Sequence, residues 1–343
     1  MSAGSGVQVR PLAPHTLDGW LSPSDPHLAH APQWATVIRQ AYGHHPLYLG
    51  AEDVSGRRAF LPAFIVRRPL VGPVITSMPF LDGGGPSIGA PDLDEPLVAR
   101  LVEEARGIGA RFVELRCARK LAIAGEPLEH KVNLVLPLAS DTNPVWRGLD
   151  QGRRYQIRKA ERSGLSVESG GAAHIDAFYS VFASRMRELG SPVHARDFFT
   201  SIVNGFADRA RVVIVRKGST PIGGLIALAA GDALTVPWSS CLTEYRADCP
   251  NMLLYWETIR AGCRDGFRRF DFGRSTRGSG TYQFKVQWGA EEKPLFWYTI
   301  PVAESARAGT SESGKATFVR LWRRLPLGLT RRLGPRVRKY LIQ

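Results

Sequence analysis

The segment from Gly273 to Ala290, GRSTRGSGTYQFKVQWGA, contains side chains suited to chemistry on an anionic or ester substrate. Arg274 is one of its cationic residues, and Lys285 follows Phe284 and precedes Trp288. We expect Lys285 to lie in or beside a strand, flanked by these aromatic rings. A lysine in such surroundings keeps its charge at a low effective dielectric, where it can stabilise a developing oxyanion. The competing interpretation is a solvated loop between two strands.

Asp271 ends the apolar stretch that precedes this segment. It could pair with Arg274 or Lys285, which is the simpler expectation, or serve as a general base. The sequence contains no Ser-His-Asp pattern and no nucleophile elbow. Cys241 is better explained as a buried structural thiol than as a nucleophile. These residues therefore favour oxyanion stabilisation over covalent catalysis.

A second cationic cluster lies on the segment RRYQIRKAERSG, which has the pattern of a helix ending at Gly164. Arg154 and Arg158 are four residues apart and share a helical face, and Lys159 lies beside them. Like charges within one turn repel each other, so a purely structural role explains them poorly. We predict that they clamp phosphate oxygens, for which the planar guanidinium gives bidentate geometry. A solvated helix face is the alternative.

The composition is that of a basic globular protein. The chain has 343 residues, 44% of them hydrophobic, and a net charge of +14 with a pI near 10.0. Such a charge favours a polyanionic partner: RNA, anionic lipid or a phosphorylated substrate. The four cysteines show neither CxxC pairs nor metal-ligand spacing, which predicts reduced thiols and no metal site. Without a signal peptide or an apolar run long enough to span a membrane, we expect a soluble cytoplasmic protein.

Helices and strands alternate along the chain. Besides the cationic helix, helical periodicity marks the ranges 34–42, 94–109, 174–190 and 251–266. Strands are expected at 58–66, 71–80, 111–117, 131–138, 210–218, 221–231, 233–241 and 267–273. The order is that of a mixed α/β protein.

The two halves of the chain resemble each other. EARGIGARFVELR and AGCRDGFRRFDFGR both end a helix and begin a strand. Aligning Gly109 with Gly266 places Glu114 on Asp271. The two copies would each be about 150 residues long, a common domain size.

Small changes of offset place Phe80 on Trp238 and Lys131 on Lys285. Each copy runs through strands with short connections, then a helix and one more strand. This order fits the GNAT acyltransferase fold and fits a doubly wound dinucleotide-binding sheet poorly. No GxGxxG joins a strand to a helix, so a dinucleotide site is not supported.

RRYQIRKAERSGLSV, PNMLLYWETIRAGCRDG and FDFGRSTRGSGTYQFKVQWGA, in this order, resemble the Fem-type (FemAB-like) aminoacyltransferases, closest to the branch associated with exosortase and exopolysaccharide loci. The resemblance covers roughly residues 30–303 and implies tandem GNAT-like domains. It implies transfer of an amino acid from aminoacyl-tRNA to an amine of a peptidoglycan precursor. The pair Phe284-Lys285 is similar to the Phe-Lys that family members place at the aminoacyl ester. Asn251 and Tyr255 from these segments, with Trp238 from the repeat, are expected to contact substrate.

The resemblance implies no cofactor besides the donor. An aminoacyl ester is already activated, so attack by an amine needs orientation, removal of one proton and an oxyanion stabiliser. An acetyl-CoA enzyme of GNAT type instead has a glycine-containing loop after its fourth strand, where backbone N–H groups hold the pyrophosphate. Here LTEYRADCPNMLL follows the strand at 233–241 and contains no glycine. The RGSG at 277–280 comes later, and we expect it not to open a helix.

The C-terminal part is a strongly basic extension. From Gly314 to Gln343 the sequence has nine lysines or arginines and no aspartate or glutamate. The apolar residues of FVRLWRRL recur at helical spacing, and Pro326 ends this helix. A basic amphipathic segment suits an anionic membrane surface, with Trp322 and its apolar neighbours buried among the headgroups. RNA binding and a disordered tail are the alternatives.

Together these features predict a GNAT-like domain at 1–145, a second at 146–303 and a basic tail at 304–343. The favoured function is transfer of an aminoacyl group from tRNA to a lipid-linked or nucleotide-linked cell-envelope precursor, of peptidoglycan or exopolysaccharide. The alternatives are an acyl-CoA-dependent N- or O-acyltransferase for exopolysaccharide sugars, and a non-catalytic RNA- or membrane-binding protein. The expected location is the cytoplasm, with peripheral attachment to the inner face of the membrane through residues 314–343.

Overall fold

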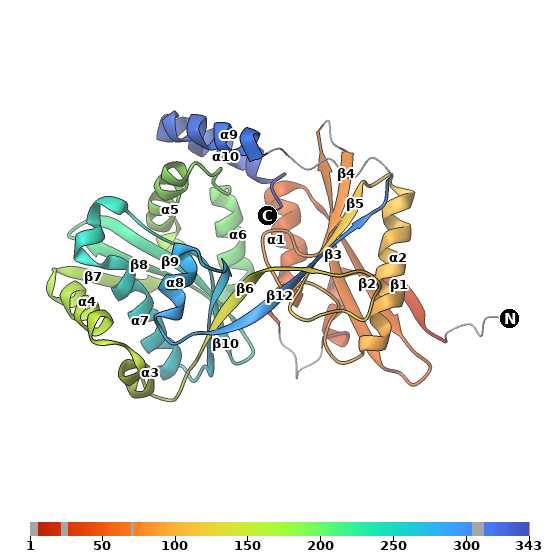
Figure 1. Cartoon of the computed structure of the whole chain (residues 1–343), viewed down its shortest axis with the longest axis horizontal. Helices are drawn as coiled ribbons and strands as arrows, with labels where there is room; N and C mark the ends of the chain where they lie inside the picture. The colour runs from red at the N-terminus through yellow and green to blue at the C-terminus, as the bar shows by residue number, and fades with distance from the viewer. Residues whose placement is uncertain (1–5, 22–26, 70–71, 304–311, 343) are drawn as a thin grey trace. The chain divides into compact units, whose positions relative to one another are not determined.

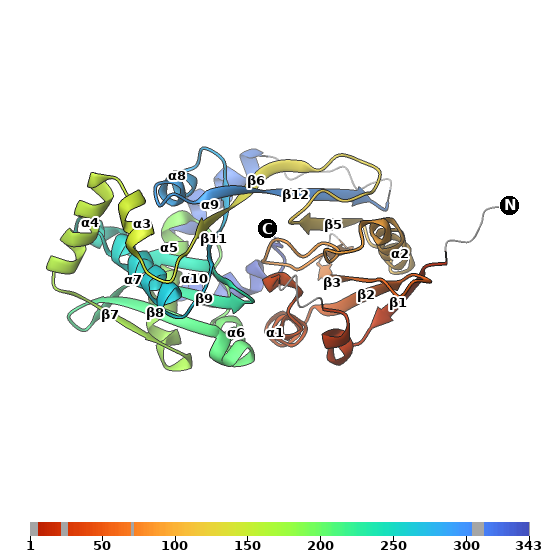
Figure 2. The same ribbon diagram turned by 90° about the horizontal axis from the view of Figure 1, so that it is seen from below.

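The computed structural model describes residues 6–21, 27–69, 72–303 and 312–342, with the backbone alone for 312–315. The chain divides into two compact units (Figures 1 and 2). Unit 1 consists of residues 1–131, 294–309 and 342–343, and unit 2 of residues 132–293 and 310–341. Each unit is a mixed α/β structure with its own apolar core.

The sheet of unit 1 has the strand order β1-β2-β3-β4-β5-β12. Its strands are β1 (Gln8–Leu12), β2 (His45–Glu52), β3 (Arg58–Arg68), β4 (Gly72–Thr76), β5 (Phe112–Cys117) and β12 (Glu291–Pro301). Neighbouring strands are antiparallel except β4 and β5, which pair in parallel. Parallel strands need a crossover connection, and α2 (Asp94–Gly107) provides it here with its buried face of Leu97, Leu101 and Ala105. Helix α1 (Gln33–Tyr42) precedes β2.

The sheet of unit 2 has the order β6-β11-β10-β9-β8-β7. Its strands are β6 (Leu128–Pro137), β7 (Leu165–Gly170), β8 (Ala210–Lys217), β9 (Thr220–Ala230), β10 (Ala233–Cys241) and β11 (Arg269–Thr276). Strands β7 to β10 are antiparallel in succession, whereas β10 and β11 are parallel. The crossover between these parallel strands contains α7 (Pro250–Arg264). The pattern of unit 1 is thus repeated.

The last strand of each sheet comes from the other half of the chain. β6 follows β5 in the sequence but borders β11 in unit 2, where Val132, Leu134 and Leu136 are buried in the core. β12 follows β11 but pairs with β5 in unit 1, from Phe296 opposite Cys117 to the end of the strand. The boundary between the compact units falls inside β6, after residue 131, so residues 132–145 of the expected first domain are part of unit 2.

The remaining helices are α3 (Asn143–Gly148), α4 (Gln151–Arg162), α5 (Ile175–Leu189), α6 (Arg196–Phe206), α8 (Gly280–Val286), α9 (Glu312–Arg324) and α10 (Leu327–Arg338). The expected helices at α4 and α5 are confirmed. Asp150 caps α4 by accepting from the Arg153 N–H, and Gly190 ends α5 in the left-handed conformation. Helices α3, α6 and α8 lie outside the ranges that we expected to be helical.

The structure bears on the repeat in two ways. Thr76 pairs with Glu114 across the parallel strands of unit 1, as Thr235 pairs with Asp271 in unit 2. The alignment of Glu114 with Asp271 is therefore supported by register. The alignment of Lys131 with Lys285 is wrong, because Lys131 lies in a strand and Lys285 lies in a helix.

The basic extension is a folded part of unit 2 where the structure describes it; residues 304–311 of the expected tail lie outside the described ranges. Helices α9 and α10 both pack on α5. Trp322 is only 5% exposed, so its expected insertion into a membrane is wrong. None of the described helices is both long and apolar enough to span a membrane.

Candidate functional site

Lys285 lies in the short helix α8 rather than in a strand. The Oγ of Ser279 accepts a hydrogen bond from the Tyr282 N–H at 3.2 Å and caps this helix. The RGSG at 277–280 thus does open a helix, contrary to expectation. The side chain of Lys285 lies beside β11, where its Nζ donates to the carbonyls of Gly273 and Arg274, each at 2.8 Å. Lys285 is only 8% exposed, so this position is fixed by the fold.

Gly273 lies inside β11 and gives the strand an irregular backbone there, which we call the turn at Gly273 and which presents these two carbonyls. Its φ of 72° is in the left-handed region, and a Cβ at this position would lie 3.1 Å from the carbonyl oxygen of Val236. Its N–H donates to Oδ1 of Asp271 at 2.7 Å. A residue with a side chain would meet both backbone strain and a steric conflict here.

Asp271 stands where the pairing of the parallel strands β10 and β11 ends, opposite Thr235. Its Oδ1 accepts from Gly273, and its Oδ2 accepts from the side-chain amide of Asn133 in β6 at 3.2 Å. Ligands of α/β sheets gather beyond the carboxyl ends of parallel strands. The carboxylate of Asp271 therefore joins β6 to the turn that holds Lys285.

Aromatic rings surround the inner side of this turn. Tyr255 from α7 stacks on Phe272 with centroids 5.2 Å apart, and its ring is also 5.2 Å from that of Phe284. Trp288 completes the group at 6.4 Å from Tyr255. Burial raises the pKa of Tyr255 to about 12, so its hydroxyl stays protonated at neutral pH. Tyr255, expected from the sequence to contact substrate, thus packs against Phe284, which was expected to act with Lys285.

The cations of α4 differ from one another in their surroundings. The guanidinium of Arg158 lies 5.3 Å above the ring of Trp146, which packs 5.1 Å from Trp256 of α7. This cation–π contact gives Arg158 a structural role. Within the described residues the side chains of Arg154 and Lys159, both half-buried, have neither a hydrogen-bond nor an ion-pair partner. Arg154 and Lys159 are therefore better candidates for anion binding than Arg158.

Trp238 packs in a different aromatic group from Tyr255 and Phe284. It packs edge-on against Phe198 and Phe199 of α6, with centroids 5.6 and 5.5 Å away, and near His194. It is 7% exposed, and this aromatic group explains its burial without a ligand.

Asn251 lies in the first turn of α7, and its Oδ1 is 3.8 Å from the Sγ of Cys241. Burial raises the pKa of the Cys241 thiol to about 12. A thiol with so high a pKa is a poor nucleophile at neutral pH, in agreement with a structural role.

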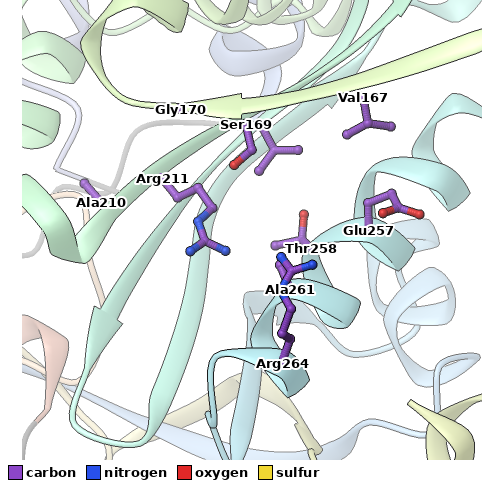
Figure 3. A pocket seen from close by; sticks show the side chains of 10 residues that line it. Val167, Ser169, Gly170, Ala210, Arg211, Glu257, Thr258, Ala261 and Arg264 are labelled. Carbon is purple, nitrogen blue, oxygen red and sulfur yellow. The ribbon is translucent and has the colours of Figure 1, made fainter. Parts of the chain in front are cut away.

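A cavity of about 500 Å³ opens in unit 2 between β7, β8 and α7 (Figure 3). Arg211 and Arg264 project from opposite walls, with Thr258 between them. Asp265 lies 2.7 Å from Arg211 and 3.7 Å from Arg264, so it compensates both charges. None of the residues expected from the sequence to act on substrate lines this cavity. Across the described ranges, no group of His, Cys, Asp or Glu could hold a metal ion.

Two residues of the candidate site were not predicted from the sequence. Gly273 had a usable signal, since an isolated glycine inside a strand pattern often marks a bulge or a close approach of the backbone. Asn133 had none, because it lies 138 residues before its partner Asp271. Only the exchange of strands brings them together.

Comparison with known proteins agrees with this architecture. Residues 151–286 match the family model of an acetyltransferase (GNAT) domain. Among solved structures, FemX is similar with a TM-score of 0.66 at 12% identity, over 85% of this chain and 97% of its own. A tandem GNAT protein from the clavulanic acid biosynthesis pathway, solved without AcCoA, gives 0.55 at 14% identity, over 87% and 99%. No curated protein matches the sequence.

A third similar structure is the C-terminal DUF2156 domain of a protein designated lysylphosphatidylglycerol synthetase from Agrobacterium fabrum. Its TM-score is 0.54 at 15% identity, over 79% of this chain and 88% of its own. Such identities establish the fold, and the family match adds the enzyme class of the second unit. The chain is therefore an acyltransferase with a tandem GNAT-like fold, in which residues 151–286 carry the match to the GNAT domain.

Proposed function

We propose that the protein transfers an aminoacyl group from aminoacyl-tRNA to an amine of a cell-envelope precursor. The observation that carries this proposal is the buried ammonium of Lys285, held by two β11 carbonyls next to Phe284. The fold similarity to FemX and the resemblance of Phe284-Lys285 to the Fem-type pair support the same reaction. The acceptor that we propose is a lipid-linked or nucleotide-linked precursor of peptidoglycan or exopolysaccharide, handled at the inner face of the membrane.

The reaction makes limited chemical demands. The acceptor amine attacks the ester carbonyl carbon, an N–C bond forms, and a tetrahedral oxyanion develops. The C–O bond to the ribose then breaks, the ribose oxygen gains a proton and the nitrogen loses one. The positive charge of Lys285 stabilises the oxyanion, and its two carbonyl contacts set the position of that charge before the substrate arrives. Orientation of the two reactants supplies roughly 7 to 11 kcal/mol of the barrier reduction.

Asp271 acts in this scheme as a positioning residue. Its carboxylate accepts from the Gly273 N–H and from Asn133, and so holds the turn that presents carbonyls to Lys285. Tyr255 packs against Phe284, the residue before Lys285 in α8, and so helps to hold this helix in place. These roles need no covalent intermediate.

The start of α7 supports a donor other than acyl-CoA. Helix N-termini bind pyrophosphate through unpaired backbone N–H groups. Here Pro250 occupies the first helical turn and has no N–H, and the Met252 N–H already donates to the Cys249 carbonyl at 3.0 Å. The connection from β10 to α7 also contains no glycine. Arg154 and Lys159 of α4 would bind phosphate groups of the donor or the acceptor.

An acyl-CoA-dependent acyltransferase is the second candidate, because the family model that matches residues 151–286 is described as an acetyltransferase. The two candidates separate in a donor assay. Purified protein is incubated with labelled aminoacyl-tRNA or with labelled acetyl-CoA, and with peptidoglycan and exopolysaccharide precursors as acceptors. We expect consumption of the tRNA ester by the unmodified protein and not by Lys285→Ala. Consumption of acetyl-CoA alone would replace our proposal with the second candidate.

A further inference from the structure

The outer side of α9 and α10 combines apolar and cationic side chains. Leu321 is 58% exposed, Leu329 40% and Phe318 38%. The exposed arginines of the two helices are Arg320, Arg323, Arg324, Arg332 and Arg336. The sequence has no acidic residue after Glu312 to compensate them. We call these eight side chains the α9–α10 surface.

The inner side of the two helices is already occupied. Trp322 is buried and stacks on Phe318 with centroids 5.2 Å apart. The Nε of Arg187 in α5 donates to the carbonyl of Leu325 at 2.6 Å, which ties down the end of α9. Arg338 of α10 donates to the buried His194 at 3.0 Å. The helices therefore have a fixed orientation on unit 2, beside α5 (Figure 1).

The apolar residues are concentrated where the helices join. Pro326 separates α9 from α10, and Leu321 and Leu329 lie about one turn before and after it. Arg324 follows Leu321 by three residues, and Arg332 follows Leu329 by three, so each leucine shares a helix face with an arginine. These leucine and arginine side chains point away from unit 2 into water, so their contacts do not stabilise the folded unit.

We propose that the α9–α10 surface binds the headgroup region of an anionic lipid bilayer. Cations contribute attraction to acidic lipids, and exposed leucines contribute burial at the boundary of the acyl chains. A nucleic acid would use the arginines but would leave Leu321 and Leu329 in water, because its stacking partners are planar side chains. The inference does not depend on the proposed reaction. In this proposal Leu321 and Leu329, rather than Trp322, are the residues that enter the bilayer.

The test is flotation of the full chain with vesicles of phosphatidylcholine, alone or mixed with phosphatidylglycerol. We expect binding to the mixed vesicles that salt weakens without abolishing. Arg320→Gln with Arg324→Gln should lower the partition coefficient by about fivefold per arginine. Leu321→Gln with Leu329→Gln should lower it by roughly tenfold and make the remainder fully salt-sensitive.

Two further variants serve as controls, with thermal unfolding to show that each protein is folded. Val54→Gln with Arg106→Gln makes the same chemical changes at exposed residues of unit 1 and should leave flotation unchanged. Trp322→Phe should also leave it unchanged, since Trp322 faces inward. Equal flotation of all folded variants would overturn the proposal. So would an unmodified chain that ignores vesicles but shifts tRNA on a gel in an Arg320- and Arg324-dependent manner.

Discussion

At the scale of single residues, Lys285 is informative because the fold buries its long cationic side chain and fixes its position. Its side chain points inward, where Nζ donates to the backbone carbonyls of Gly273 and Arg274. These two hydrogen bonds set the position of Nζ before a substrate binds, and preorganisation of this kind is what stabilisation of an oxyanion requires.

Lys285→Ala should lower turnover by ~10²-fold or more, the scale for loss of one oxyanion-stabilising group. The matched control is Lys293→Ala, an exposed lysine eight residues further along the chain, which should retain full turnover. Steady-state rates and circular dichroism measure activity and folding separately. Normal turnover of a folded Lys285→Ala variant would remove the residue from the site.

Gly273→Ala should reduce both stability and turnover. The left-handed conformation costs a non-glycine residue about 1–2 kcal/mol, and the added Cβ would press on the Val236 carbonyl. Gly278 has a similar φ of 75° but open space around its Cβ position. Gly278→Ala is therefore the control: it should lose a similar amount of stability, measured by denaturant titration, and keep its turnover.

The sequence allowed some of these residues to be predicted and not others. Phe284, Lys285, Tyr255 and Asp271 stand in one short region or on the helix before it. Lys285 between aromatic residues suggested oxyanion chemistry, and Asp271 suggested a partner for a cation or a general base. The conformation of Lys285 could not be predicted, because a seven-residue helix gives too short a periodic signal. Asn133 could not be predicted either, because its partner Asp271 lies 138 residues further along the chain.

At the scale of elements, the long helices and buried strands could be predicted well, since each has a clear apolar period and an end signal. α5 is an example, with its left-handed Gly190. α6 has an equally strong apolar face, formed by Phe198, Phe199, Ile202 and Phe206. It was not predicted as a helix, because no glycine or proline directly follows its end. The basic extension was predicted as a helix, but the direction in which Trp322 points depends on α5.

Helix α4 offers a comparison within one element. Arg154→Gln and Lys159→Gln should raise the Michaelis constant of the donor or the acceptor and change stability by less than ~0.5 kcal/mol, as surface substitutions do. Arg158→Gln should lose stability instead, because its guanidinium stacks on Trp146. The measurements are initial rates over a range of substrate concentrations and denaturant titration. A stability loss at Arg154 with unchanged Michaelis constants would assign it to structure.

The contact between α10 and His194 should make stability depend on pH. Burial and Arg338 lower the pKa of His194 well below 6.5, so the folded protein holds the imidazole neutral. As pH falls below 6.5 the unfolded chain takes up a proton that the folded chain refuses, and stability decreases. His194→Gln should lessen this decrease in the free energy of unfolding, and His45→Gln, at an exposed histidine, should not. Parallel pH profiles for all three proteins would contradict the role of His194.

At the scale of the whole molecule, the fold class could be predicted from the repeat, but the exchange of strands could not. Each sequence copy ends in an apolar strand, and nothing in β6 or β12 indicates which sheet it will join. The exchange is therefore a property of the chain as a whole.

A fragment of residues 146–343 should fail to fold by itself. It lacks β6, whose Val132, Leu134 and Leu136 are nearly or fully buried in unit 2. Burying three such side chains is worth roughly 5–9 kcal/mol, comparable to the whole stability of a domain, about 5–15 kcal/mol. Mixing the 146–343 fragment with a fragment of residues 1–145 should restore a folded complex, detected by gel filtration and circular dichroism. Cooperative unfolding of 146–343 alone would contradict this expectation.

The exchange of strands between the two units also sets the order in which the ribosome completes the strands of each sheet. Multidomain chains usually complete their N-terminal domain first during synthesis. Here the strands of the unit 2 sheet end at Thr276, whereas the sheet of unit 1 waits for β12, which begins at Glu291. Translation therefore delivers all the strands of the second sheet before it delivers the last strand of the first. A nascent chain halted between these two residues would carry every strand of the later unit and an open edge on the earlier one.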